Sequence, residues 1–221
     1  MTIDRSEHDV KFISYIKRYA IHIIIILIGL YIIFPVLAPV LMRFGLDKPA
    51  KLIYWLYSHL CHQLAYRSWF IFGEEAFFPL SEANVWDGLS YQQAFGLPGS
   101  DFDAARSIIG NEIYGYKIAL CQRDLAIYCA LFFFGLVYLI TGKRIKKINI
   151  FLWVLLGVIP LGFDGLTQLI KNIPIKTISS IIFRESTPLL RTWTGAAFGF
   201  FTGWYIFPSI DSLIRGSEKT N

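Results

Sequence analysis

Charge and cysteine are both scarce in this chain of 221 residues. Only 17% of the residues are charged, whereas 55% are hydrophobic and 17% are aromatic. So little charge excludes an ordinary soluble domain and favours an integral membrane protein. The three cysteines are too few for a disulfide-rich scaffold. Cys129 falls inside an apolar run, so Cys61 and Cys121 are the informative pair.

The net charge of +5 does not indicate a nucleic-acid partner. Lysine and arginine gather at the ends of apolar runs, which is typical of membrane loops rather than of a surface that binds a groove. We therefore expect membrane lipids as partners, with protein partners in the membrane and no nucleic acid.

Four apolar runs are long enough to cross a bilayer. The predicted spans are residues 20–42, 118–140, 150–170 and 189–207. They lie in a membrane domain over residues 20–214, which follows an N-terminal arm (1–19) and precedes a tail (215–221). The last span has a strong start signal, with Thr187 as the cap and Pro188 at the first helical position. On that span Gly195, Gly199 and Gly203 recur every four residues, which lets a neighbouring helix approach closely.

Residues 50–66 decide the topology. This segment is apolar but contains His59, Cys61 and His62. If it spanned the membrane, the basic residues 143–147 would lie outside, against the positive-inside rule. We therefore predict an all-α, polytopic membrane helix bundle with four spans plus an outer interfacial or re-entrant helix over 50–66. The acidic segment 69–117 is then an outer loop, and both termini of this multi-pass protein of the cell membrane are cytoplasmic.

This topology brings polar residues from four segments to the outer face. Arg123, Arg184 and Arg191, with Thr194, are predicted to bind an anionic substrate, because arginine grips phosphate or carboxylate through two hydrogen bonds. Asp164, Asp124 and Gln168 are the candidate acid/base residues. The competing interpretation is a buried ion-pair network that holds the helices in register.

Two chemistries remain open for the cysteines. His59 and His62, with Cys61 and Cys121, are candidate ligands for zinc or another transition metal, although their spacing fits no standard zinc motif. Alternatively, Cys61 and Cys121 form a structural disulfide on an outward face. Catalytic thiol cycling is disfavoured because the sequence has no CxxC.

Four phrases resemble a family of predicted bacterial and archaeal membrane proteins, DUF2085. They are Cys61-His62-Gln63, Cys121-Gln122-Arg123-Asp124, Asp164-Gly165-Leu166-Thr167-Gln168, and Arg184-Glu185-Ser186-Thr187 continuing through Arg191-Thr192-Trp193-Thr194-Gly195. The resemblance implies a membrane protein and marks these residues, but it supplies no reaction.

Two functions follow from these observations. The first is a metal-dependent enzyme that acts on an anionic, membrane-borne substrate such as a lipid phosphate. The second is a non-enzymatic accessory or assembly subunit with a structural disulfide and ion-pair network. A transporter is less favoured, because the four spans show no repeat.

Overall fold

Long helices make up most of the computed structural model, which describes residues 3–83, 88–170 and 185–218. The helices are α1 (Ile3–Arg43), α2 (Asp47–Ser58), α3 (Tyr91–Phe95), α4 (Phe102–Ser107), α5 (Gln122–Ile140), α6 (Ile150–Trp153), α7 (Ile159–Ile170) and α9 (Pro188–Glu218). The strands are β1 (Ser68–Ile71), β2 (Gly110–Asn111) and β3 (Gly115–Cys121). Single turns form η1 (Ala65–Arg67) and η2 (Ser81–Ala83), and a π-helical stretch, η3 (Val154–Val158), joins α6 to α7.

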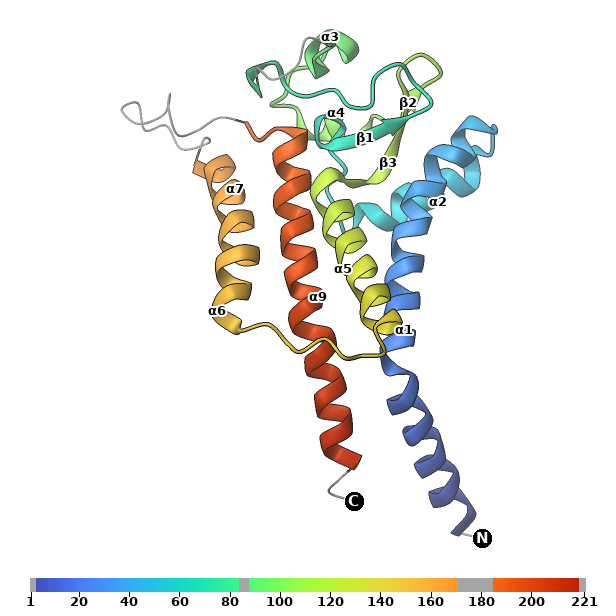
Figure 1. The fold of residues 1–221 in the computed structure, drawn as a ribbon. Coiled ribbons are helices and arrows are strands. Elements are labelled where there is room, and N and C mark those ends of the chain that lie inside the picture. Colours follow the sequence, from blue (N-terminus) through green and yellow to red (C-terminus); the bar gives the residue numbers. More distant parts are fainter. Residues whose placement is uncertain (1–2, 84–87, 171–184, 219–221) are drawn as a thin grey trace.

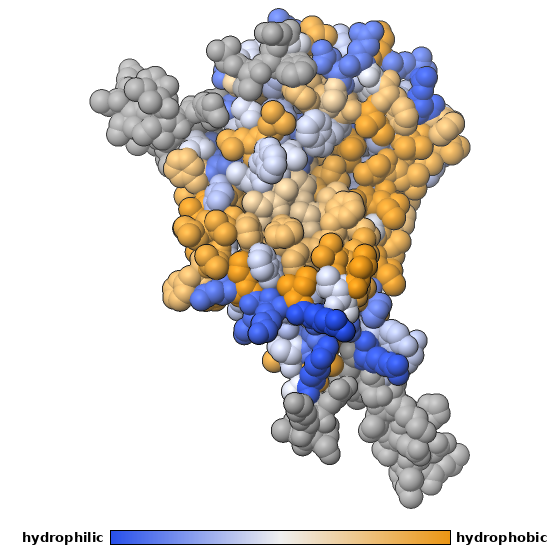
Figure 2. Space-filling model, viewed as in Figure 1, coloured by the Kyte–Doolittle hydropathy of each residue, from blue (hydrophilic) through white to orange (hydrophobic). Residues whose placement is uncertain are grey.

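Three helices among the described residues are long and apolar enough to cross a membrane, namely Arg18–Arg43, Gln122–Ile140 and Ile150–Gln168. They lie side by side with α9 in one bundle (Figure 1). Large apolar side chains are exposed along them, including Leu27, Phe133 and Phe163, and they form an apolar band between two hydrophilic ends (Figure 2). Such a band is costly in water and suits lipid. The prediction of a mainly helical membrane protein is therefore confirmed.

The fourth predicted span, residues 189–207, lies within α9, which is not among these three candidates. Its apolar residues are interrupted by Arg191, by threonines and by glycines, and these residues lower its hydropathy. The predicted start of this helix is correct, because α9 begins at Pro188 and the Thr187 Oγ1 accepts a hydrogen bond from the Leu190 N–H at 3.0 Å.

The glycines of α9 pack against α5, as the four-residue spacing predicted for a neighbouring helix. A Cβ at Gly195 would lie 2.6 Å from the Arg123 carbonyl oxygen, and one at Gly199 would lie 2.1 Å from that of Ile127. Real Cβ atoms do not approach other atoms so closely, so only glycine lets these two backbones meet.

A small sheet domain covers one end of the bundle, which we call the sheet end (Figure 1). Its antiparallel strands run in the order β1-β3-β2. The domain contains a cluster of buried apolar side chains, namely Leu64, Ala65, Tyr66, Phe70, Phe78, Leu80, Tyr91 and Ala105. The prediction of an outer loop over 69–117 missed this domain. The opposite end, which we call the basic end, carries the connection 143–147 between α5 and α6.

Two predicted boundaries were also wrong. The predicted span 118–140 begins as a helix only at Gln122, because the preceding residues form β3, and most of that strand is buried. The predicted helix over 50–66 ends at Ser58, and Cys61 and His62 follow it in an irregular segment. A buried strand without polar alternation cannot be told from the start of an apolar helix by its sequence pattern.

Candidate functional site

A cavity of about 1080 Å³ lies where the sheet domain meets the helices. Residues from the segment after α2, from the start of α5, from the end of α7 and from α9 line it, including Cys61, Arg123, Gln168 and Arg191. The structure therefore brings to one cavity the four segments that the topology placed at one membrane face.

Two cysteines and a carboxylate gather on the wall of this cavity. The Sγ atoms of Cys61 and Cys121 and a carboxylate oxygen of Asp124 all lie within 4.8 Å of one another. Cys121 is the N-cap of α5, and its sulfur accepts a hydrogen bond from the Asp124 N–H at 3.4 Å. The Cys121 N–H in turn donates to the sulfur of Cys61 at 3.3 Å. The helix start thus fixes all three groups.

The two thiols differ in acidity because one hydrogen-bonds to the other. The hydrogen bond from Cys121 lowers the pKa of the Cys61 thiol, although burial opposes this effect. The same hydrogen bond, together with burial, raises the pKa of Cys121. Cys61 is therefore the first of the pair to become a thiolate.

Hydrogen bonds to carbonyl groups of α2 hold the segment that carries Cys61. The Cys61 N–H donates to the Tyr57 carbonyl at 2.9 Å as α2 ends. Gln63 then adopts a φ of 53°, in the left-handed region. Its side-chain Nε2 donates to the Tyr54 carbonyl at 2.9 Å, which stabilises this uncommon conformation. The chain reverses here and leaves the Cys61 sulfur against β3.

Lys117 on β3 also holds the segment that carries Cys61, through a hydrogen bond to Gln63. It was not predicted as a site residue. Its side chain is fully buried, and its Nζ donates to the Gln63 carbonyl at 2.7 Å and to the Arg106 carbonyl at 2.6 Å. Burial lowers the pKa of Lys117 to about 7. The signal in the sequence was a single lysine within the otherwise apolar stretch 116–121.

Two arginines on the cavity wall share one carboxylate. The Nη2 of Arg191 lies 2.5 Å from the Oε1 of Glu185, and the Nη2 of Arg67 lies 3.1 Å from the same oxygen. Arg191 also donates to the Tyr66 carbonyl at 3.3 Å. Arg67 and Glu185 were absent from the predicted site. Glu185 lies in one of the four phrases that resemble the family, and Arg67 directly follows the segment 50–66.

Arg123 forms an ion pair with the buried Asp164, which ties α5 to α7. Gln168, one turn after Asp164, donates from Nε2 to the Asp164 carbonyl at 2.8 Å. Asp164 itself does not line the large cavity. It contacts that cavity through Arg123 and Gln168, which both line it.

The remaining predicted residues are dispersed. His62 is exposed and lines the cavity, whereas the Nδ1 of His59 lies 2.9 Å from the Trp55 carbonyl, outside the Cys61–Cys121–Asp124 cluster. Thr194 lines a second, smaller pocket and donates to the Leu190 carbonyl at 2.8 Å. Arg184 lies outside the described residues. Cys61, Cys121 and Cys129 are all free thiols, so the predicted disulfide is not present.

Comparisons with known proteins place this chain among membrane proteins. An uncharacterized protein of Methanocaldococcus jannaschii is 33% identical over 112 residues, which are 48% of this chain. The match spans 62% of the relative's length, less than two thirds of it. No solved structure gave a significant match. Residues 103–205 match the sequence model of the family described as "Predicted membrane protein (DUF2085)", which confirms the resemblance to that family.

Proposed function

We propose that this is a multi-pass protein of the cell membrane with four spans, α9 being the fourth. Both termini and the basic end are cytoplasmic, and the cavity at the sheet end opens on the outer side. The basic connection 143–147 supports this orientation through the positive-inside rule, as does the surplus of acidic residues in the segment 69–117.

Labelling of single cysteines in intact cells tests this orientation. A membrane-impermeant maleimide is expected to label Asp101→Cys in the sheet domain and to leave Lys146→Cys unlabelled until the cells are permeabilised. The two exposed positions suit this test. Labelling of both from the same side would overturn the proposed topology.

At this cavity we propose a metal-dependent enzyme site, with zinc or another transition metal held by Cys61, Cys121 and Asp124. The observation that carries this proposal is the convergence of these three ligand groups within 4.8 Å on a cavity wall. Two thiolates and one carboxylate form a donor set that zinc accepts, and three protein ligands leave a position for water or substrate. His62, which lines the same cavity, is the candidate for a fourth contact.

The proposed substrate is an anionic group on a membrane-borne molecule. Arg67 and Arg191 share the carboxylate of Glu185, so this group of three carries one more positive than negative charge. Their Nε atoms are also buried without an acceptor among the described residues. A phosphate or carboxylate would balance the charge and accept these hydrogen bonds. A metal ion beside it would polarise the substrate oxygen.

In this proposal, Asp164 and Gln168 act as positioning residues. Asp164 binds Arg123 and thereby fixes the guanidinium at the cavity wall. Of the two predicted catalytic carboxylates, Asp124 is the one that lines the cavity itself. Arg184 stays a proposed substrate contact, whereas Thr194 lines the smaller pocket rather than this cavity.

A non-enzymatic accessory subunit is the second candidate, because the ion pairs join separate elements. Arg123–Asp164 ties α5 to α7, and Arg67–Glu185 ties the sheet domain to the residue stretch before α9. Such pairs suit a structural network. In that case the cysteines carry no metal.

Metal analysis of the purified protein separates the two candidates. The protein is isolated in detergent without chelator or reductant, and its metal content and free thiols are measured for the wild type, Cys61→Ser and Cys121→Ser. Cys129→Ser is the matched control, because Cys129 lies two turns further along α5, outside the cluster. We expect near-stoichiometric metal in the wild type and control and a loss of most of it in the other two.

The opposite result is equally informative. Metal-free wild-type protein with a Cys61–Cys121 disulfide would contradict the metal site and favour the accessory subunit. Metal that survives both substitutions would place the ion elsewhere in the chain.

A further inference from the structure

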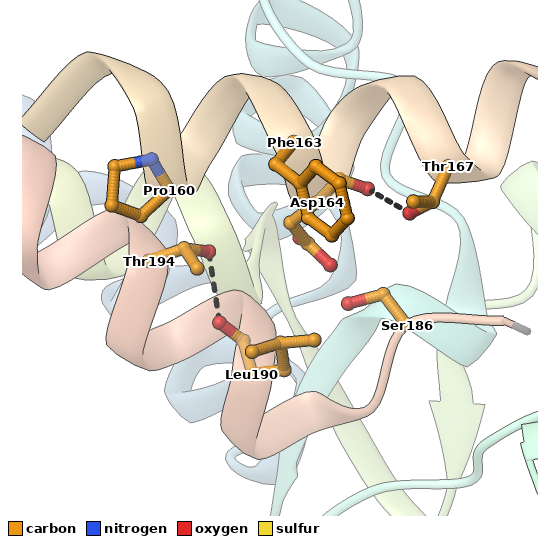
Figure 3. A pocket seen from close by; sticks show the side chains of 7 residues that line it. All are labelled: Pro160, Phe163, Asp164, Thr167, Ser186, Leu190 and Thr194. Atoms are coloured by element: carbon orange, nitrogen blue, oxygen red, sulfur yellow. Dashed lines mark hydrogen bonds between the residues drawn. The ribbon is translucent and has the colours of Figure 1, made fainter. Parts of the chain in front are cut away.

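A second pocket, of about 300 Å³, lies between α7 and the start of α9. Apolar side chains form much of its lining, namely Pro160, Phe163 and Leu190 (Figure 3). Phe163 is 66% exposed on the surface of α7. The pocket therefore reaches the apolar face of the bundle, and a ligand can enter it sideways from the bilayer.

Most hydrogen-bonding groups at this pocket are already occupied. The Thr167 hydroxyl donates to the Asp164 carbonyl at 3.0 Å, and the Thr194 hydroxyl donates to the Leu190 carbonyl at 2.8 Å (Figure 3). The Oδ2 of Asp164 accepts from Arg123 and, at 3.5 Å, from Gln168. These groups are satisfied by the protein and have little left to offer a ligand.

Two atoms are different. The Oδ1 of Asp164 and the Oγ of Ser186 have no hydrogen-bond partner among the described residues. The two residues are 3% and 2% exposed, respectively, and their side chains point toward one another across the pocket (Figure 3). A buried polar atom without a partner is costly, and native proteins satisfy nearly all of them. Two such atoms on opposite walls of one pocket indicate a missing polar group.

The charge balance selects the kind of polar group. Arg123 already neutralises Asp164, so the pocket does not attract a second cation strongly. It does not attract an anion either, because the free carboxylate oxygen would repel one. The Oδ1 of Asp164 needs a donor, whereas the Ser186 hydroxyl can donate to an acceptor. An alcohol hydroxyl supplies both functions from one oxygen.

We propose that this pocket binds the hydroxyl of a neutral, membrane-borne alcohol, with Asp164 accepting from that hydroxyl and Ser186 donating to it. The hydrocarbon part packs against Phe163, Pro160 and Leu190. This site is independent of the metal and of the anionic substrate proposed above. Arg123 and Gln168 link the two, since both contact Asp164 and both line the large cavity.

Photo-crosslinking in phosphatidylcholine nanodiscs tests the site. The probes are a long-chain primary alcohol that carries a diazirine, its methyl ether and its phosphate ester. On the wild type we expect the alcohol to label the pocket wall near Phe163 and Leu190 about fivefold more than the ether, the difference that one hydrogen bond makes. The phosphate ester is expected to label these positions no better than the ether.

Variants sharpen the comparison. Ser186→Ala is expected to reduce labelling by the alcohol about fivefold, because the hydroxyl oxygen of the alcohol loses its donor. Ser209→Ala is the matched control, because the Ser209 hydroxyl donates to the Tyr205 carbonyl within α9, away from the pocket. Leu190→Trp fills the pocket and is expected to abolish labelling by both probes.

Equal labelling by the alcohol and the ether on the wild type would overturn the proposal, even if Ser186→Ala failed to fold. So would full labelling of a folded Ser186→Ala by the alcohol. Stronger labelling by the phosphate ester at the same positions would assign the pocket to an anion instead.

Discussion

The sheet end and the basic end of the bundle both contain ion pairs, but in different surroundings. At the sheet end, Arg191 meets Glu185 with only 3% of the arginine side chain exposed. At the basic end, Arg215 meets Asp211 one helical turn away, with 61% of the arginine side chain exposed. Exposed pairs contribute little because water screens them, whereas buried pairs are costly if either partner is lost. The same kind of ion pair therefore lies on a cavity wall at one end and includes a largely exposed arginine at the other.

The largest expected contrast comes from removing one member of an ion pair at each end, a buried carboxylate at the sheet end and an exposed arginine at the basic end. Glu185→Gln keeps the side-chain volume but leaves Arg67 and Arg191 without their shared counter-ion, and we expect the free energy of unfolding to fall by about 3–5 kcal/mol. Arg215→Gln at the basic end is expected to cost about 1 kcal/mol or less, because Arg215 is exposed and Asp211 keeps Lys143 as a partner. Thermal unfolding in detergent measures both variants. Equal losses of the free energy of unfolding in the two variants would contradict the expected difference between the two ends.

A smaller effect on the free energy of unfolding is expected from a change of pH, because Lys117 is buried at the sheet end. Unfolded Lys117 keeps its proton up to about pH 10.5, whereas burial lowers its pKa in the folded protein to about 7. Between these values the unfolded state binds more protons, so the free energy of unfolding should rise with pH. We expect a rise of about 2 kcal/mol between pH 7 and pH 9 that Lys117→Met removes.

Lys51→Met is the control for this titration. Lys51 is exposed and pairs with Asp47 one turn earlier on α2, so its replacement should leave the pH dependence of unfolding as in the wild type. A wild-type slope that persists in Lys117→Met would assign the titration to another group, with the neighbouring cysteines as the next candidates.

The smallest expected effect tests anion binding. Inorganic phosphate at about ten times its dissociation constant should stabilise the wild type by about 1.4 kcal/mol. Arg67→Gln leaves Arg191 and Glu185 as a balanced pair, so the variant should fold but lose most of this gain. Arg215→Gln at the basic end should keep the full stabilisation by phosphate. Sodium chloride at matched ionic strength separates binding from screening, and an equal gain in Arg67→Gln would count against the anion site.

Much of the candidate site could be predicted because charge and helical spacing constrain it. Cys121 and Asp124 are three residues apart at a helix start, and the structure places both on the cavity wall. The positive-inside argument brought Cys61 to the same face, although its own segment is not helical there. Contacts that depend only on which end of a helix a residue occupies follow from the topology.

The remaining contacts depend on backbone geometry that no local pattern encodes. Lys117 looked like a charge that bounds a span, because β3 is as apolar as a helix. The pairing of Arg67 with Glu185 joins positions 118 residues apart. His59 is separated from the cysteines because α2 ends at Ser58. After this end, Cys61 packs in one apolar cluster with residues of α1 and β3.

The ion pair between Arg67 and Glu185 also has a consequence for the order in which the protein is made. The sheet domain is synthesised before α7 and α9, but its link to the bundle needs a carboxylate that precedes the last helix. Until the chain through Glu185 has been synthesised and has left the ribosome, Arg67 has no access to that carboxylate. The cavity is therefore among the last parts of the molecule to form during biosynthesis, after the cysteines that line it have already left the ribosome.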